Sequence, residues 1–331
     1  MNKSMLAIAG VAVVAMLTGS AYAQGKKELA IVVKGLDNPF FSAMGQGCAD
    51  WNTAHPDSEY TCTYNGPATA ADEAGELQIV QDLINKGVAG IAISPSNAPA
   101  MANTLRQIAP KIPVMTIDAP LDAADQKELA KTYFGTDNYA MGVQMGEWAL
   151  KLLPNGGKVC LQQGNPAAAN LLLRADGFRD TVTGEKGTKA LTGQKGWTEV
   201  AGCPNITNDD VALANQQIAD TMTANPDLNA YILTGGWAQF APQAYTQNFG
   251  PLKDKIAAKT FIVIAGDTTD SQRQVFRDGL SNVQVGQRPY QMGNEASDIL
   301  IKLINGEAVD PIIFTGLDTC SQEDIGICAN P

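Results

Sequence analysis

The sequence predicts an α/β fold with two doubly wound parallel sheets, each the core of its own lobe. Short apolar runs alternate with longer helical stretches along the chain, and the pattern restarts at Thr132. Repeated strand–helix–strand units of this kind form a parallel sheet that is covered on both faces. The chain has 331 residues, which is long enough for two separate hydrophobic cores.

The first series of elements runs from residue 29 to residue 117. Strands are expected at residues 29–33, 60–64, 90–94 and 114–117. Helices are expected between them, at residues 40–53, 72–86 and 98–109. The helix at 72–86 has apolar residues at helical spacing and stops at Gly87, a residue type that often ends helices.

The second series has the same alternation. Its expected strands are residues 132–134, 158–161, 197–201, 230–233, 261–264, 282–285 and 312–314, the last strand of the chain. Its expected helices are residues 139–152, 170–183, 211–224, 271–278 and 290–304. No low-complexity linker separates the two series, which indicates two closely packed lobes and favours more than one crossing of the chain between them.

Residues 1–23 have the pattern of a secretory signal peptide. Lys3 precedes an apolar run over residues 5–17, and Ala21-Tyr22-Ala23 is an A-x-A cleavage pattern. The run is shorter than the ~20 residues that a membrane-spanning helix needs. We therefore expect an exported, periplasmic protein whose mature chain is soluble and begins near Gln24.

Charge and cysteine content narrow the function further. The 34 acidic residues exceed the 23 basic ones, for a net charge of −11, which argues against nucleic acid or anionic membrane as a partner.

An oxidising compartment favours disulfides among the six cysteines, although the sequence alone permits 15 pairings. We favour three bridges between expected neighbours, Cys48–Cys62, Cys160–Cys203 and Cys320–Cys328. With no C-x-x-C and a single His, no metal site is expected.

Several polar and aromatic residues stand where predicted strands end, which is where open α/β sheets bind ligands. Asp118 and Asp267 each follow a strand; each is either a helix N-cap or a carboxylate that faces a shared cleft and accepts from neighbouring hydroxyls. Phe40 and Phe41 are either core residues or faces that stack on a sugar ring. Gln287 is either a solvated loop residue or a side chain that offers a hydroxyl both a donor and an acceptor.

Five segments then match a known pattern in order: residues 37–41, 112–118, 174–178, 266–269 and 286–289. Together they resemble the type I periplasmic sugar-binding proteins, the family of the ribose-binding protein. The resemblance extends from about residue 28 to about residue 314.

The resemblance implies two α/β lobes that are joined by a three-crossing hinge and close over a ligand. The lobes would comprise residues 24–135 plus 288–313 and residues 136–287 plus 314–331. The residues implied in ligand contact are Asn38, Phe40, Phe41 and Asp118 in the first lobe and Arg174, Asp267 and Gln287 in the second. Arg174 would donate to ligand oxygens and partly balance the two carboxylates.

The sequence departs from the ribose-binding pattern at two positions. Ala119 stands where the pattern has Arg, and Gly235 stands where it has Asn. A site without those polar partners loses affinity for ribose, so we expect a different ligand. Trp237 would fill part of that wall, although it is equally a packing residue, and Asn170 would supply a replacement polar group.

The predicted function is capture of a small neutral sugar or sugar alcohol for import by an ABC transporter. Two carboxylates against one Arg disfavour anionic ligands. The implied partner is the membrane permease, and we expect a monomer without a cofactor. An alternative is a sensor that presents the bound sugar to a chemoreceptor or sensor kinase. An enzyme is less favoured, because G-x-G-x-x-G, G-x-x-x-x-G-K-[ST] and G-x-S-x-G are all absent and the only His is His55, at a helix end.

Overall fold

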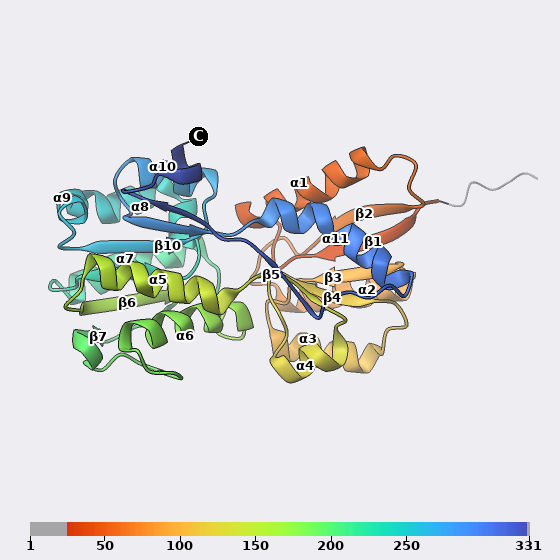
Figure 1. Ribbon diagram of the computed structural model, residues 1–331, viewed down its shortest axis with the longest axis horizontal. Coiled ribbons are helices and arrows are strands. Elements are labelled where there is room, and N and C mark those ends of the chain that lie inside the picture. Colours follow the sequence, from red (N-terminus) through yellow and green to blue (C-terminus); the bar gives the residue numbers. More distant parts are fainter. Residues whose placement is uncertain (1–24, 330–331) are drawn as a thin grey trace, which may run out of the picture.

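The protein folds into two α/β lobes that lie side by side along the long axis of the molecule (Figure 1). The structure is a computed structural model and describes residues 25–329. The predicted signal peptide, residues 1–23, lies outside the described residues. The predicted fold class, two lobes each built on a parallel sheet, is confirmed.

The first lobe is built on a six-stranded, fully parallel sheet with the order β12-β5-β4-β3-β1-β2. Its strands are β1 (Lys27–Val32), β2 (Tyr60–Asn65), β3 (Gly90–Ile93), β4 (Val114–Ile117), β5 (Tyr133–Thr136) and β12 (Ile312–Thr315). Its helices are α1 (Pro39–Ala54), α2 (Glu73–Lys86), α3 (Ala98–Ile108), α4 (Ala123–Leu129) and α11 (Pro289–Ile304). Apolar residues of α1 and α11 pack on one face of the sheet, and those of α2 and α3 on the other.

The second lobe has a sheet with the order β13-β11-β10-β9-β6-β7, and β8 pairs with β6. Its strands are β6 (Gly157–Gln163), β7 (Trp197–Glu199), β8 (Asn205–Ile206), β9 (Ala230–Leu233), β10 (Ile262–Gly266), β11 (Val283–Gly286) and β13 (Asp318–Ser321). Its α-helices are α5 (Asn138–Leu152), α6 (Ala169–Thr183), α7 (Val211–Ala224), α8 (Pro242–Phe249), α9 (Lys253–Ala257) and α10 (Asp270–Arg277). Apolar residues of α5 and α6 cover one face, and those of α7 to α10 cover the other.

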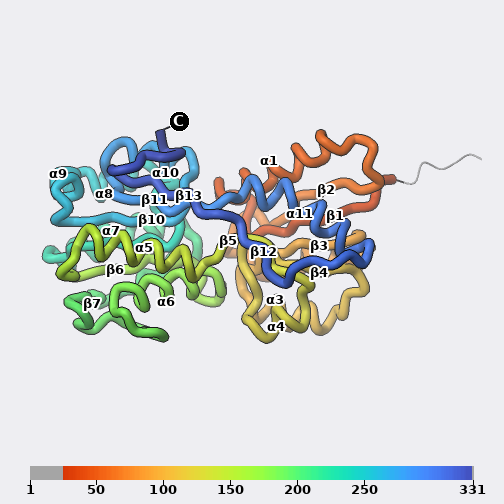
Figure 2. Tube along the Cα trace, in the orientation of Figure 1, coloured from red at the N-terminus to blue at the C-terminus, as the bar shows by residue number. Residues whose placement is uncertain are grey.

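The chain passes between the two sheets three times (Figure 2). It leaves the first sheet after β5, returns between β11 and α11, and leaves again between β12 and β13. Helix α11 follows a strand of the second lobe but packs against α1 of the first. Each lobe is therefore assembled from segments that are distant in the sequence.

The structure also contains elements that the sequence did not predict. Helices α4, α8 and α9 and strands β8 and β13 were missed. The expectation that residues 312–314 form the last strand is wrong, because β13 follows and pairs antiparallel with β11. β13 reads Asp318-Thr319-Cys320-Ser321, and this short polar segment at a sheet edge has no apolar run to mark it.

In each lobe one pair of helices packs closely at glycines. A Cβ atom on Gly293 of α11 would collide with the backbone carbonyl of Met44 in α1. A Cβ atom on Gly142 of α5 would collide with the backbone carbonyl of Arg174 in α6. The second contact holds α6 against α5 and thereby sets the position of Arg174.

The three favoured disulfides are present. Cys48–Cys62 joins α1 to β2, Cys160–Cys203 joins β6 to the loop before β8, and Cys320–Cys328 ties the last turn to β13. Among residues 25–329, no helix is both long enough and apolar enough to cross a membrane.

Candidate ligand-binding cleft

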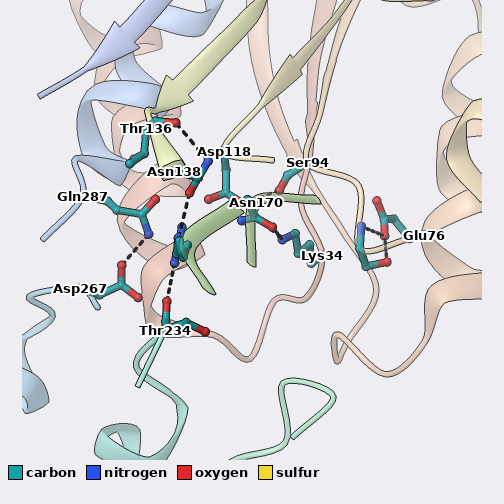
Figure 3. A network of polar contacts seen from close by, with 12 residues as sticks. Lys34, Glu76, Ser94, Asp118, Thr136, Asn138, Asn170, Thr234, Asp267 and Gln287 are labelled. Atoms are coloured by element: carbon teal, nitrogen blue, oxygen red, sulfur yellow. Dashed lines mark hydrogen bonds and ion pairs between the residues drawn. The ribbon is translucent and has the colours of Figure 1, made fainter. Parts of the chain in front are cut away.

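The loops after the carboxyl ends of strands from both sheets meet in one cavity between the lobes (Figure 3). All nine residues that the sequence analysis named line this cavity. They are Asn38, Phe40, Phe41, Asp118, Asn170, Arg174, Trp237, Asp267 and Gln287. The cavity lies at the edge of the parallel sheets where α/β proteins bind their ligands.

One wall of the cavity is aromatic. Phe40 and Phe41 lie in the first turn of α1, whose N-cap Asn38 accepts a hydrogen bond from the Phe40 backbone N–H at 2.9 Å. The two rings meet edge to face, with centroids 5.2 Å apart. Both residues are buried in the core of the first lobe and also line the cavity. The packing and ligand-facing interpretations are therefore compatible for both residues.

Asp118 and Asp267 are placed alike, after β4 and β10. Both have a left-handed backbone, with φ of 62° and 75°, a conformation that Asp tolerates better than most residues. The Asp118 carboxylate accepts from the Ser94 hydroxyl at 2.7 Å, and the Asp267 carboxylate accepts from the Gln287 amide at 2.6 Å. Burial raises the pKa of Asp267, while the positive charge of Arg174 acts in the opposite direction.

Two hydrogen bonds hold the Arg174 side chain at the cavity. The residue is 2 % exposed. Its Nε donates to Asn138 Oδ1 and one terminal nitrogen donates to the Thr234 carbonyl, each at 2.8 Å. Asn138 in turn donates to the carbonyl of Thr136, at the first crossing of the chain. The guanidinium is therefore fixed to the end of β9 and, through α5, to a segment that joins the lobes.

Trp237 occupies the space beside Gly235. A Cβ atom on Gly235 would lie 2.7 Å from the indole ring, so the glycine leaves room for the tryptophan. Trp237 is 5 % exposed and packs in the core of the second lobe as well as lining the cavity. An indole therefore stands beside the position at which the ribose-binding pattern has an amide.

Two charged residues of the cavity, Lys34 and Asp209, were not predicted from the sequence. The Lys34 ammonium lies 3.6 Å from the Asp118 carboxylate and donates to Asn170 Oδ1 at 3.2 Å, which links the two lobes. Lys34 stands just beyond the predicted strand 29–33, so the strand-end rule could have identified it. Asp209 follows the two-residue β8, for which no sequence signal exists. The expected balance of two carboxylates against one Arg is corrected to three carboxylates against Arg174 and Lys34.

The lobes also touch at the rim opposite the crossings. Asn165 of the second lobe donates to the Glu73 carboxylate of α2, and the Ala98 backbone N–H donates to the Ala167 carbonyl at 3.1 Å. The free volume of the cavity is about 30 Å³, which holds one or two water molecules. The structure is therefore a closed arrangement of the two lobes.

Two α/β lobes that are joined by three crossings and enclose a polar cavity define a two-lobed solute-binding protein. The sequence matches the family described as "Periplasmic binding protein domain" over residues 29–308. The chain belongs to this family.

Named relatives and solved structures extend over nearly the whole chain. The ribose import binding protein RbsB of Escherichia coli K12 is 28% identical over 318 residues, which cover 93% of this chain and 95% of the relative. The D-allose-binding periplasmic protein of the same organism is 24% identical and covers 94% and 95%. A solute-binding protein of Burkholderia graminis in complex with D-arabinose is 25% identical with a TM-score of 0.74, covering 90% of this chain and 96% of that structure.

Proposed function

We propose that this protein is exported to the periplasm, captures a neutral sugar or sugar alcohol between its lobes and delivers it to an ABC-type permease. The observation that carries the proposal is that side chains from both lobes, chosen from the sequence as ligand contacts, line one cavity. Relatives named for ribose and D-allose binding, and a similar structure in complex with D-arabinose, support a sugar. Residues 1–23 would be the signal peptide, cleaved near Ala23.

The cavity suits hydroxyl groups, because a hydroxyl both donates and accepts. Asp118 and Asp267 supply acceptors, Arg174 supplies donors, and Gln287 supplies both. Phe40 would offer an aromatic face to the apolar C–H face of a sugar ring. Three carboxylates against two cations leave the cavity unfavourable for a ligand that is itself an anion.

The ligand we propose is not ribose, although relatives of this chain are named for ribose. Ala119 has no side-chain polar group and is fully buried. Gly235 also has none, and the indole of Trp237 occupies its surroundings. The ribose hydroxyls that the Arg and Asn of the ribose-binding pattern would hold have no side-chain partner from these two positions, which lowers affinity.

Ligand capture would work by closure of two bodies, one built on the sheet β12-β5-β4-β3-β1-β2 and the other on the sheet β13-β11-β10-β9-β6-β7. A cavity of about 30 Å³ is too small to hold a sugar, so the lobes must separate to admit the ligand and must close around it with a larger space between them than in this structure. A ligand that bridges both lobes then favours closure by its higher affinity for the closed state. The permease would recognise the closed shape.

A thermal-shift screen of the mature protein tests this function. The panel contains D-ribose, D-allose, D-arabinose, D-arabinitol, xylitol and myo-inositol, with D-gluconate and L-glutamate as anionic controls. A ligand that binds only the folded state raises the Tm. We expect at least one neutral compound to raise the Tm more than D-ribose does, and to be recovered chemically unchanged. A shift by an anionic control alone, or no shift by any neutral compound, would overturn the proposal.

A further inference from the structure

The cavity has two chemically distinct ends. Strands β11 and β10 lie next to the crossings, whereas β9, β6 and β8 lie progressively farther away; in the first sheet the order outward is β4, β3, β1. Asp267 and Gln287 therefore lie at the crossing end, and Lys34 and Asp209 at the outer end. Figure 3 shows Lys34 and the Asp267–Gln287 pair on opposite sides of Asp118.

Asp209 presents an unpaired acceptor at the outer end. Its Oδ1 is shielded from solvent and has no hydrogen-bond partner among residues 25–329. A Cβ atom on residue 164 would collide with this oxygen, so Gly164 makes room for the carboxylate. Burial raises the pKa of Asp209, while the charge of Lys34 and the backbone N–H of Asn165 near the carboxylate act in the opposite direction. A buried acceptor of this kind needs a donor from another molecule.

Lys34 presents a buried cation to the same space from the other lobe. It is 4 % exposed, and its ammonium group, which has three donors, contacts Asn170 and Asp118. Asp209 comes from the second lobe, so the two charges approach only when the lobes close.

We propose that Lys34 and Asp209 form an interlobe subsite that binds one hydroxyl of the ligand, with Lys34 donating to it and Asp209 accepting from it. This inference rests on the proposed function and specifies the ligand further. A carboxylate or phosphate would be repelled by Asp209, and an ammonium group by Lys34. A methyl group would leave the Asp209 acceptor without a donor. Only a group that both donates and accepts satisfies the pair, so the ligand carries hydroxyls at both of its ends.

The test uses Asp209→Asn, Lys34→Met and the double variant. Asn tolerates the left-handed backbone of Asp209, whose φ is 63°, and Met preserves most of the length of Lys without its charge. Asp210→Asn is the matched control, because Asp210 is exposed and caps α7 through the Leu213 backbone N–H. Each protein is titrated calorimetrically with D-allose, D-arabinose and D-arabinitol, and its ligand-free Tm is recorded.

We expect each single variant to weaken binding by about 10-fold or more, with a ligand-free Tm close to that of the wild type. The double variant should lose less than the product of the two single losses, because both side chains bind one hydroxyl. Binding within twofold of the wild type in both single variants, or strictly multiplicative losses, would overturn the inference and leave the proposed function intact. If neither these three compounds nor any other neutral compound of the thermal-shift panel binds the wild type, the proposed function and the inference fail together.

Discussion

Replacing Asp267 by asparagine perturbs the proposed cleft at its crossing end with little effect on the backbone. Asp267 has a φ of 75°, which Asn tolerates. The carboxylate accepts from the Gln287 amide at 2.6 Å, and the carbonyl oxygen of Asn can still accept that bond. The variant therefore exchanges one buried carboxylate oxygen for an amide and removes one negative charge.

The expected loss follows from the kind of hydrogen bond that is removed. Hydrogen bonds to charged groups contribute about 1.5–3 kcal/mol, against about 0.5–1.5 kcal/mol for neutral pairs. If Asp267 holds a ligand hydroxyl, Asp267→Asn should weaken binding by about 1–3 kcal/mol, and so raise Kd by about 5–150-fold.

Isothermal titration of D-allose and D-arabinose into the mature protein measures this effect. Asp278→Asn is the control, because Asp278 is an exposed carboxylate at the end of α10. Asp118→Asn should show a loss of the same order, since Asp118 has the same backbone conformation at the end of β4. Kd values within twofold of the wild type for both Asp267→Asn and Asp118→Asn would refute the placement of the cleft.

Three further predictions concern stability, each measured by urea unfolding. Burial raises the pKa of Glu76 from 4.5 to about 7, so the folded state binds this proton more tightly than the unfolded state does. The free energy of unfolding that this proton contributes is fully present below about pH 4.5 and is lost as the pH rises through about 7. The expected loss in the free energy of unfolding is about 3 kcal/mol. Glu76→Gln should abolish this pH dependence, and an equal pH dependence in the wild type and the variant would contradict the prediction. Replacing both Cys160 and Cys203 by Ser opens a bridge with a sequence separation of 43, and should cost about 4 kcal/mol; a loss below about 1 kcal/mol would be inconsistent with that closure entropy. Gly293→Ala should cost about 1–3 kcal/mol, because the added Cβ collides with the Met44 carbonyl; an unchanged midpoint would show that α1 and α11 separate without strain.

The sequence was sufficient to locate most of the cleft, because the carboxyl ends of parallel strands always meet at one edge of the sheet. Asp118 and Asp267 could be identified by that rule alone. Arg174 lies on a helix, and its position depends on the close approach of α5 and α6 at Gly142, which periodicity does not reveal. Asp209 was missed because β8 is only two residues long.

The missed secondary structure has a common physical origin. Helices α4 and α9 are 7 and 5 residues long, too short to show a full apolar stripe. Strand β13 exists because β11 offers it an edge and Cys320–Cys328 ties it to the last turn. Such tertiary partners are not visible in the local sequence. The disulfides could be favoured only because the predicted topology made each pair neighbours.

We expect a neutral, hydroxyl-rich ligand to draw the two separable lobes together. Small-angle X-ray scattering of the mature protein, alone and with a saturating concentration of the neutral compound that raises its Tm most, measures this directly. We expect a smaller radius of gyration with that compound than without it. An unchanged radius of gyration at saturation would contradict capture by lobe closure.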